Sequence, residues 1–309
     1  MIDTRPRLPS PPGTCDTHMH IFEPGYTMLP GANQPSIPAG AAEYRQLRAR
    51  LGITRTVIVQ PAAYGNDNRC TLAAMAALAD EAHQMRGVAI VLPEESDAHI
   101  AALTAAGIRG IRYHLLPSGC VTWDTLGTMA ARVAPHGWHV QIQTSSRELA
   151  EHAALLESLP CDIVVDHIGR FDQPVAADDA AWKTFRRLVD RGRCWVKLSA
   201  PYHGSKTGAP TYADAAASAK ELIRAAPERM LFGTNWPHPS LQANLPDDAT
   251  LLDLVNEWAG SEAVRQAILV GNAARVYGFQ SPGLPPIATM VRFAFPSRRH
   301  CPPADTNDP

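Results

Sequence analysis

Residues 14–22 read TCDTHMHIF, a short apolar and β-branched run that carries two histidines separated by one residue. Side chains on a strand point to alternate faces, so His18 and His20 should project from the same face. This spacing predicts a convergent pair of imidazoles at the end of a strand. The competing interpretation is a chance His-x-His pair, because the chain contains 12 histidines.

Seven more short β-rich runs follow this one, and helical segments separate them. The expected strands are residues 14–21, 56–61, 87–92, 108–114, 139–143, 163–167, 194–198 and 230–233. The expected helices are residues 41–51, 69–85, 98–106, 123–134, 146–158, 178–191, 212–225 and 251–258. Several strands are nearly continuous apolar runs, which is typical of parallel strands covered on both faces. Eight alternating repeats predict an α/β fold, a closed (β/α)8 TIM barrel rather than an open sheet.

No linker or low-complexity block divides the chain. We therefore expect one barrel domain over residues 1–280, with the barrel itself running from about residue 14 to residue 279. Residues 281–309 contain seven prolines and no steady helical period. This composition predicts an extended or disordered tail, and the alternative for residues 290–295 is an edge strand packed on the barrel.

Charge and composition favour a small-molecule substrate. The 28 basic and 30 acidic residues leave a net charge of −2, which supplies no field to hold nucleic acid or an anionic membrane. No stretch approaches the ~20 apolar residues of a membrane span, and residues 1–12 lack the apolar run of a secretory signal. Six cysteines without CxxC spacing predict free, buried thiols. We expect a cytoplasmic protein, whose composition leaves its oligomeric state open.

Polar residues also follow later strands. The run VDHIGR places His167 after the sixth strand, and GTNWPHP places Asn235 after the eighth. Polar side chains just beyond the strands of a barrel gather at one face, where the catalytic residues of this fold lie. His18, His20, His167 and Asn235 should therefore converge.

Taken together, the motifs DTHMH, DHIGR, GTNWPHP and GNAARVY resemble the amidohydrolase-2 group of the amidohydrolase superfamily. The resemblance covers about residues 14–279, and within the group it extends to lactone-processing enzymes. It implies a (β/α)8 barrel enzyme that opens or rearranges a cyclic ester, so the implied partner is a small-molecule lactone or carboxylate.

In metal-dependent members of the superfamily, the resemblance implies that the His-x-His pair shares a cation with later histidines and an aspartate after strand eight. Here Asn235 stands at that position, the fifth strand ends without a histidine, and the fourth ends at His114 without a lysine or glutamate. A neutral amide is a weak ligand and cannot take the proton of a metal-bound water. We therefore expect no metal and no cofactor. The alternative is a three-nitrogen zinc site at His18, His20 and His167.

Without a metal, the ester carbonyl must be polarised by cations and hydrogen-bond donors. Arg112, near the end of the fourth strand, is the expected catalytic cation, and an ion pair inside the barrel is the structural alternative for it. Arg109 should face the other side, and one of Tyr113 and His114 must point away from the mouth. The expected substrate-binding residues are Gln60, Tyr64, Gln143, Arg170, Tyr202 and His238. Capping of the next helix is the alternative for Arg170.

The missing aspartate also bears on the reaction. The resemblance implies that related lactone hydrolases activate water with it, and that they carry a substrate-binding arginine where this chain has Ser118. Isomerisation needs no water, because a hydroxyl of the substrate attacks the ring carbonyl. We expect metal-independent isomerisation of a sugar-acid (aldaric) lactone such as galactarolactone, with His18, His20 or His167 carrying the proton and Arg112 and Asn235 stabilising the oxyanion. The alternatives are a lactone hydrolase with histidine as base and a non-catalytic sugar-acid binding protein.

Overall fold

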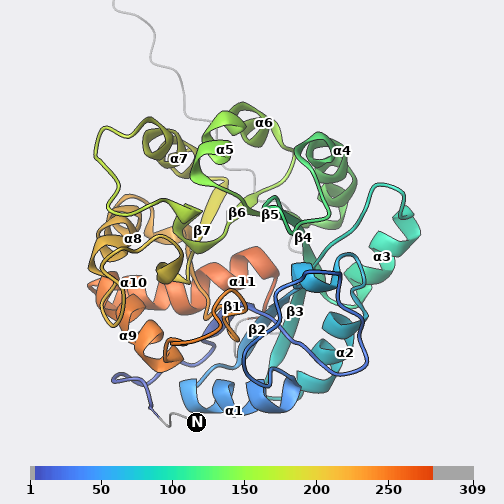
Figure 1. The fold of residues 1–309 in the computed structure, drawn as a ribbon, viewed down its shortest axis with the longest axis horizontal. Coiled ribbons are helices and arrows are strands. Elements are labelled where there is room, and N and C mark those ends of the chain that lie inside the picture. Colours follow the sequence, from blue (N-terminus) through green and yellow to red (C-terminus); the bar gives the residue numbers. More distant parts are fainter. Residues whose placement is uncertain (1–3, 281–309) are drawn as a thin grey trace, which may run out of the picture.

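The computed structural model describes residues 4–280. Eight parallel strands lie side by side in sequence order around a barrel (Figure 1). They are β1 (Cys15–Met19), β2 (Arg55–Val59), β3 (Gln84–Ala89), β4 (Ile108–His114), β5 (His139–Gln143), β6 (Ile163–Val165), β7 (Cys194–Leu198) and β8 (Met230–Phe232). The predicted (β/α)8 barrel is confirmed.

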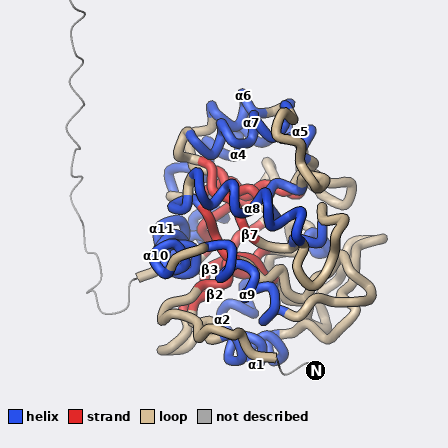
Figure 2. Tube along the Cα trace, turned by 90° about the vertical axis from the view of Figure 1, so that its left-hand side faces the viewer, coloured by secondary structure: helices blue, strands red, loops and turns tan. Residues whose placement is uncertain are grey.

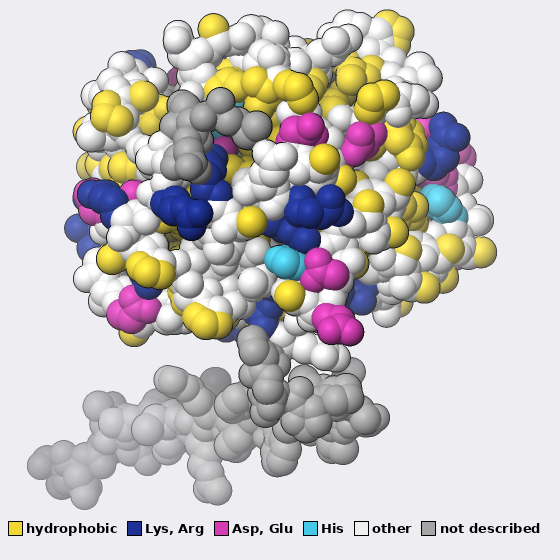
Figure 3. Space-filling model, turned by 90° about the horizontal axis from the view of Figure 1, so that it is seen from below, with side chains coloured by type: hydrophobic (Ala, Val, Ile, Leu, Met, Phe, Trp, Pro, Cys, Tyr) yellow, Lys and Arg dark blue, Asp and Glu magenta, His cyan; other side chains and the backbone are white. Residues whose placement is uncertain are grey.

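Helices cover the outside of the strands, and the longer loops gather at one end of the barrel (Figure 2). The helices are α1 (Ala41–Leu51), α2 (Arg69–Leu78), α3 (Asp97–Ala105), α4 (Trp123–Val133), α5 (Ser146–Glu151), α6 (Ala153–Ser158), α7 (Ala180–Asp190), α8 (Ala213–Ala225), α9 (Asp248–Ala259), α10 (Glu262–Gln266) and α11 (Asn272–Tyr277). None of the helices in the described part of the chain is long and apolar enough to cross a membrane. Basic and acidic side chains are interspersed on the face that Figure 3 shows.

Two predicted helices differ most from the structure. The helix expected over residues 69–85 ends at Leu78, and β3 already begins at Gln84. Asp80 turns the chain, because its Oδ1 accepts hydrogen bonds from the main chain two residues on (2.9 Å) and from the ring of His83 (2.7 Å). The helix expected over residues 146–158 is divided into α5 and α6.

The cysteine prediction holds only in part. Cys15, Cys70 and Cys194 are buried and Cys161 is half-buried, whereas Cys120 is exposed in the loop between β4 and α4. Cys301 and the predicted tail lie outside the described residues.

Side chains alternate along each strand and divide the barrel interior into two zones. Trp195 and Lys197 on β7, and Ser199 directly after it, occupy successive inward positions, whereas Val196 and Leu198 pack among the outer core residues. Lower in the barrel, apolar inward side chains such as Val57, Val88 and Leu231 pack against Ala273 and Tyr277 of α11. The upper inward positions are polar, so charged and hydrogen-bonding groups collect at the C-terminal ends of the strands.

Asp16 joins the two ends of the barrel. Main-chain bonds from Asn235 N to His18 O (2.7 Å) and from His20 N to the chain after β8 (2.8 Å) complete the circle. Asp16 Oδ1 accepts from the main-chain N of His18 (3.1 Å) and of Thr234 (3.0 Å), and Oδ2 accepts from the Thr234 hydroxyl (2.7 Å). The carboxylate therefore holds the histidine strand against the loop that carries Asn235.

Gly233, directly after β8, lies against His18 of β1. A Cβ at Gly233 would lie 2.7 Å from His18 Cβ and 3.1 Å from His18 N. We expect Gly233→Ala to lower the free energy of unfolding by ~1–3 kcal/mol, because strand backbone must shift to admit the methyl group. Gly127 in α4 is a matched control, since a Cβ there would meet only Leu155 Cδ1 at 3.8 Å. Gly127→Ala should raise the free energy of unfolding by ~0.5–1 kcal/mol, because alanine favours the helix. Urea denaturation followed by circular dichroism measures both, and a Gly233→Ala protein as stable as the wild type would contradict the argument.

Candidate functional site

A cavity of about 600 Å³ opens at the C-terminal ends of the strands. Six of the residues expected at the site line it: His20, Arg112, Gln143, His167, Arg170 and Asn235. His18 lies directly beneath, with its ring centroid 5.0 Å from that of His20 and 4.6 Å from that of His167. None of the lining residues in the described part of the chain is acidic, so the cavity favours an anionic ligand.

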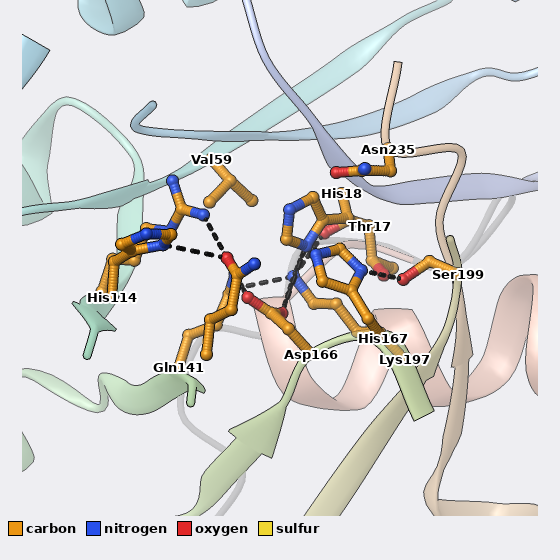
Figure 4. Close-up of polar contacts among 12 residues, drawn as sticks. Thr17, His18, Val59, His114, Gln141, Asp166, His167, Lys197, Ser199 and Asn235 are labelled. Atoms are coloured by element: carbon orange, nitrogen blue, oxygen red, sulfur yellow. Dashed lines mark hydrogen bonds and ion pairs between the residues drawn. The ribbon is translucent and has the colours of Figure 1, made fainter. Parts of the chain in front are cut away.

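A buried charged network supports the histidines from below (Figure 4). Lys197 Nζ donates to Gln141 Oε1 (2.7 Å) and to the carbonyl of Thr17 (2.8 Å), and it lies 3.7 Å from Asp166 Oδ1. Gln141 Nε2 donates to Asp166 Oδ2 (3.1 Å), and His18 Nδ1 lies 3.1 Å from Asp166 Oδ1. Lys197 and Asp166 have fully buried side chains, so each charge is stabilised by the other and by these hydrogen bonds.

Burial keeps the imidazoles of the site neutral. It lowers the pKa of His20 to about 3, with a further contribution from the charge of Arg112. Burial lowers the pKa values of His18 and His167 well below the ordinary value, and Lys197 and His18 respectively add to the effect. The pKa of Lys197 falls to about 8, also by burial, so this amine is protonated at neutral pH.

Arg112 sets the hydrogen-bonding pattern on one side of the cavity. Its guanidinium donates to the main-chain carbonyl of Gln60 and, over 2.8 Å, to Gln143 Oε1. Because a guanidinium can only donate, the oxygen of the Gln143 amide must face it. His114 Nδ1 lies 3.0 Å from the same oxygen and must therefore carry a proton, while its Nε2 accepts from Ser118 Oγ (3.0 Å). Within the described residues, Arg112 has no carboxylate partner at ion-pair distance.

Other expected site residues are placed away from the cavity. The Gln60 side chain donates to two main-chain carbonyls in its own loop and accepts from Thr71. Tyr64 packs against Phe22 and Tyr26 instead of lining the cavity. Both side chains shape the loop after β2.

Tyr202 and His238 lie behind Asn235. Asn235 Nδ2 donates to Tyr202 Oη (2.7 Å), and Tyr202 Oη lies 3.0 Å from His238 Nδ1. Neither residue is among those that line the cavity, so both lie behind Asn235 and not at the expected substrate-contacting positions.

Two further histidines line the cavity, and neither was among the expected site residues. His114 points into the cavity, whereas Tyr113 points outward and bonds to Thr125 (3.0 Å). His203 lies in the short 3-10 turn after β7, with its ring centroid 5.0 Å from that of His167. Its position beyond a strand end is the only sequence signal for it, because the turn brings it back over the barrel only in the folded chain.

The chain is similar in sequence and in fold to known proteins. A family model described as Amidohydrolase matches residues 15–279. D-galactarolactone isomerase from Agrobacterium fabrum is 36% identical over 278 residues, which cover 89% of this chain and 94% of the relative. A 2-pyrone-4,6-dicarboxylate hydrolase from Comamonas testosteroni is 33% identical over 286 residues, covering 89% and 93%. A crystal structure of an Agrobacterium tumefaciens protein in the apo state is similar with a TM-score of 0.82 at 36% identity, covering 89% of this chain and 99% of that one.

The buried histidines should make the fold sensitive to acid. Burial lowers the pKa of His139, at the start of β5 and below the cavity, from 6.5 to about 3. Between these values the unfolded chain binds a proton that the folded chain does not, so the free energy of unfolding falls as the pH falls. We expect His139→Gln to reduce the stability loss between pH 7 and pH 5 by about 2 kcal/mol relative to the wild type. Urea titrations at both pH values measure this difference, and equal losses in the two proteins would contradict a neutral His139.

Proposed function

The chain belongs to the amidohydrolase family, and we propose that it is a metal-independent isomerase of a sugar-acid (aldaric) lactone such as galactarolactone. Its relatives include a lactone isomerase and lactone hydrolases, so it is a lactone-processing enzyme of this family. The observation that carries the finer proposal is Asn235 at the end of the barrel, in a cavity whose described lining holds no carboxylate to activate water. A substrate hydroxyl is then the available nucleophile, and its tethering supplies a high effective concentration.

His20 is the histidine best placed to carry the proton. Its Nδ1 lies 2.7 Å from the carbonyl oxygen of Val59, which can only accept, so Nδ1 carries the ring proton. Nε2 therefore holds a lone pair, and the ring lines the cavity. Because the ring is neutral, Nε2 can take the proton of the attacking hydroxyl and return it to the oxygen that leaves the carbonyl.

Arg112 is the cation closest to this proton transfer. The positive charge of Arg112 helps to lower the pKa of His20, and its guanidinium has no acidic partner within the described residues. As the hydroxyl attacks, the carbonyl oxygen becomes an oxyanion, which the guanidinium stabilises until the old ester bond breaks. Asn235, which lines the same cavity, contributes its amide to the same reacting group.

The second cation of the cavity, Arg170, can bind a carboxylate of the substrate. Arg170 lines the cavity, and its side chain makes no hydrogen bond or ion pair with the rest of the described chain. Its guanidinium can hold a carboxylate bidentately. Together with Arg112 it gives the cavity two cations, which suits a sugar acid and not a neutral lactone.

Metal independence is supported by the charges around the imidazoles. His18, Asp166 and His167 offer ligand atoms that all lie within 4.8 Å of one another. The Asp166 carboxylate, however, already accepts from Gln141 and lies beside the Lys197 amine. A divalent cation there would face a buried ammonium with no free carboxylate to balance it. These residues do not fit a resident metal ion, and the mechanism contains no step through one.

The function is tested by NMR of a panel of aldaric and aldonic lactones with protein dialysed against a chelator, run in water enriched in ¹⁸O. Isomerisation changes the ring size without incorporating the label, whereas hydrolysis incorporates it. Reactions without protein correct for spontaneous ring opening. Turnover by ring exchange alone supports the proposal. Label uptake establishes the hydrolase instead, binding without turnover leaves a sugar-acid binding protein, and activity restored only by added metal refutes metal independence.

Arg112→Met should lower kcat/KM on the order of 10²-fold, because the oxyanion loses its preset cation. Arg109→Met is the matched control on the same strand. Within residues 4–280, the Arg109 side chain bonds only to the carbonyls of Thr104 and Ile108 and does not line the cavity, so kcat/KM should stay within about twofold. Steady-state kinetics on the lactone identified by NMR measure both variants. Equal losses in the two would assign Arg112 a structural role.

Asn235→Asp separates the two reactions. The carboxylate has no N–H to donate to Tyr202, and it places a negative charge next to the developing oxyanion. Isomerisation should fall by about tenfold or more, while water attack appears or increases because a carboxylate can act as general base. The ¹⁸O assay measures both rates. Isomerisation at the wild-type rate in Asn235→Asp would remove Asn235 from the mechanism.

A further inference from the structure

A chain of buried polar groups leads from the cavity to the start of α9. Asn235 Nδ2 donates to Tyr202 Oη (2.7 Å), Tyr202 Oη lies 3.0 Å from His238 Nδ1, and His238 Nε2 lies 3.3 Å from Asp248 Oδ1. Asn235, His238 and Asp248 are all nearly inaccessible to solvent. Water therefore does not compete for these contacts, and each group must match its neighbour as donor or acceptor.

The backbone holds this chain in place. Asn235 and His238 have φ angles of 60° and 59°, in the left-handed region, and His238 N donates to Asn235 O (2.7 Å). A left-handed conformation is unfavourable for histidine, so surrounding contacts must maintain it. The effect is to turn the His238 ring back toward Tyr202 and Asp248.

The position of Asp248 determines which atoms donate and which accept along this chain of contacts. A carboxylate attracts the nitrogen that bears the proton, so the ring proton of His238 lies on Nε2, which faces Asp248 Oδ1 over 3.3 Å, a charge contact without hydrogen-bond geometry. Nδ1 then accepts the hydroxyl proton of Tyr202, and the Tyr202 oxygen accepts from Asn235 Nδ2. The amide of Asn235 is thereby left with Oδ1 and its second N–H for the cavity.

We propose that Asp248, His238 and Tyr202 form a positioning relay that determines which way the Asn235 amide faces. The inference rests on the proposed function only in that Asn235 faces the reacting lactone. The three residues do not touch the substrate; they act through Asn235. If an N–H group replaced the carboxylate, the pattern could run the other way: Nδ1 would carry the proton, Tyr202 would donate to Asn235, and the amide would be reversed.

The first experiment reads the relay without any substrate. In protein labelled with ¹⁵N-histidine, the ring shifts distinguish protonated from unprotonated nitrogens, and the signal missing in His238→Gln identifies His238. The wild type should show the proton on Nε2. Asp248→Asn allows an N–H to face Nε2, so the Nδ1-protonated form should appear. Asp253→Asn, the same change elsewhere on α9, should leave the His238 signals unchanged.

The second experiment asks whether the relay acts through Asn235. Tyr202→Phe removes the hydroxyl and should lower kcat by about tenfold, with KM changed by less than about twofold, because binding contacts remain. In an Asn235→Ala background the same substitution should cost less than about twofold, because the group it positions is gone. Tyr113→Phe is the matched control. It loses a partly buried hydroxyl bond to Thr125 outside the cavity and should leave kcat within about twofold.

A wild-type His238 protonated on Nδ1 alone would overturn the relay. So would a loss from Tyr202→Phe that is equally large in the Asn235→Ala background, since Tyr202 would then act on substrate directly. If Asn235→Ala is too slow to assay, the tautomer measurement decides. Failure of the proposed function gives a different pattern: no lactone is isomerised, yet the His238 tautomer still responds to Asp248→Asn.

Discussion

The carboxylate of Asp16 is the point on which the arrangement of the site depends. It receives two hydrogen bonds from main-chain N–H groups and one from the Thr234 hydroxyl, and Tyr44 of α1 donates a fourth (3.0 Å). Burial raises its pKa to about 6, even though these hydrogen bonds lower it. The group ties the first strand to the chain after the last one. The imidazoles on β1 and the amide after β8 therefore have a fixed separation before any substrate arrives.

A second constraint is the pairing of Lys197 with Asp166 inside the barrel. Each charge would be costly alone, because water is excluded from both. Lys197 only donates, so Gln141 must turn its oxygen to the amine and its nitrogen to Asp166. In the same way, the Val59 carbonyl determines that Nδ1 of His20 carries the ring proton. Arg112 determines that the amide oxygen of Gln143 faces the guanidinium. The cavity thus presents donors and acceptors whose orientation is set in advance, which is what stabilisation of an oxyanion requires.

The pattern of the sequence was sufficient for the barrel and for the centre of the site. Alternation on the first strand placed His18 and His20 together, and their positions after strand ends placed His167, Arg112 and Asn235 at the same mouth. These predictions depend only on local periodicity and on the parallel direction of the strands. Tyr202 and His238 were expected beside the substrate, and the structure places them behind Asn235, because which side of a loop residue faces the cavity depends on its backbone conformation.

The sequence by itself determined the number and order of the βα repeats, the residue types at each strand end and the absence of an aspartate at position 235. These are properties of spacing and residue identity, so they can be read from the sequence before the chain folds. Only the tertiary structure decided which nitrogen of His20 carries its proton and which way the Gln143 amide faces. It also decided that Arg112 lacks an acidic partner within the described residues. Those properties come from donors and acceptors contributed by distant strands, and a buried polar group has no defined orientation until the fold supplies its partner.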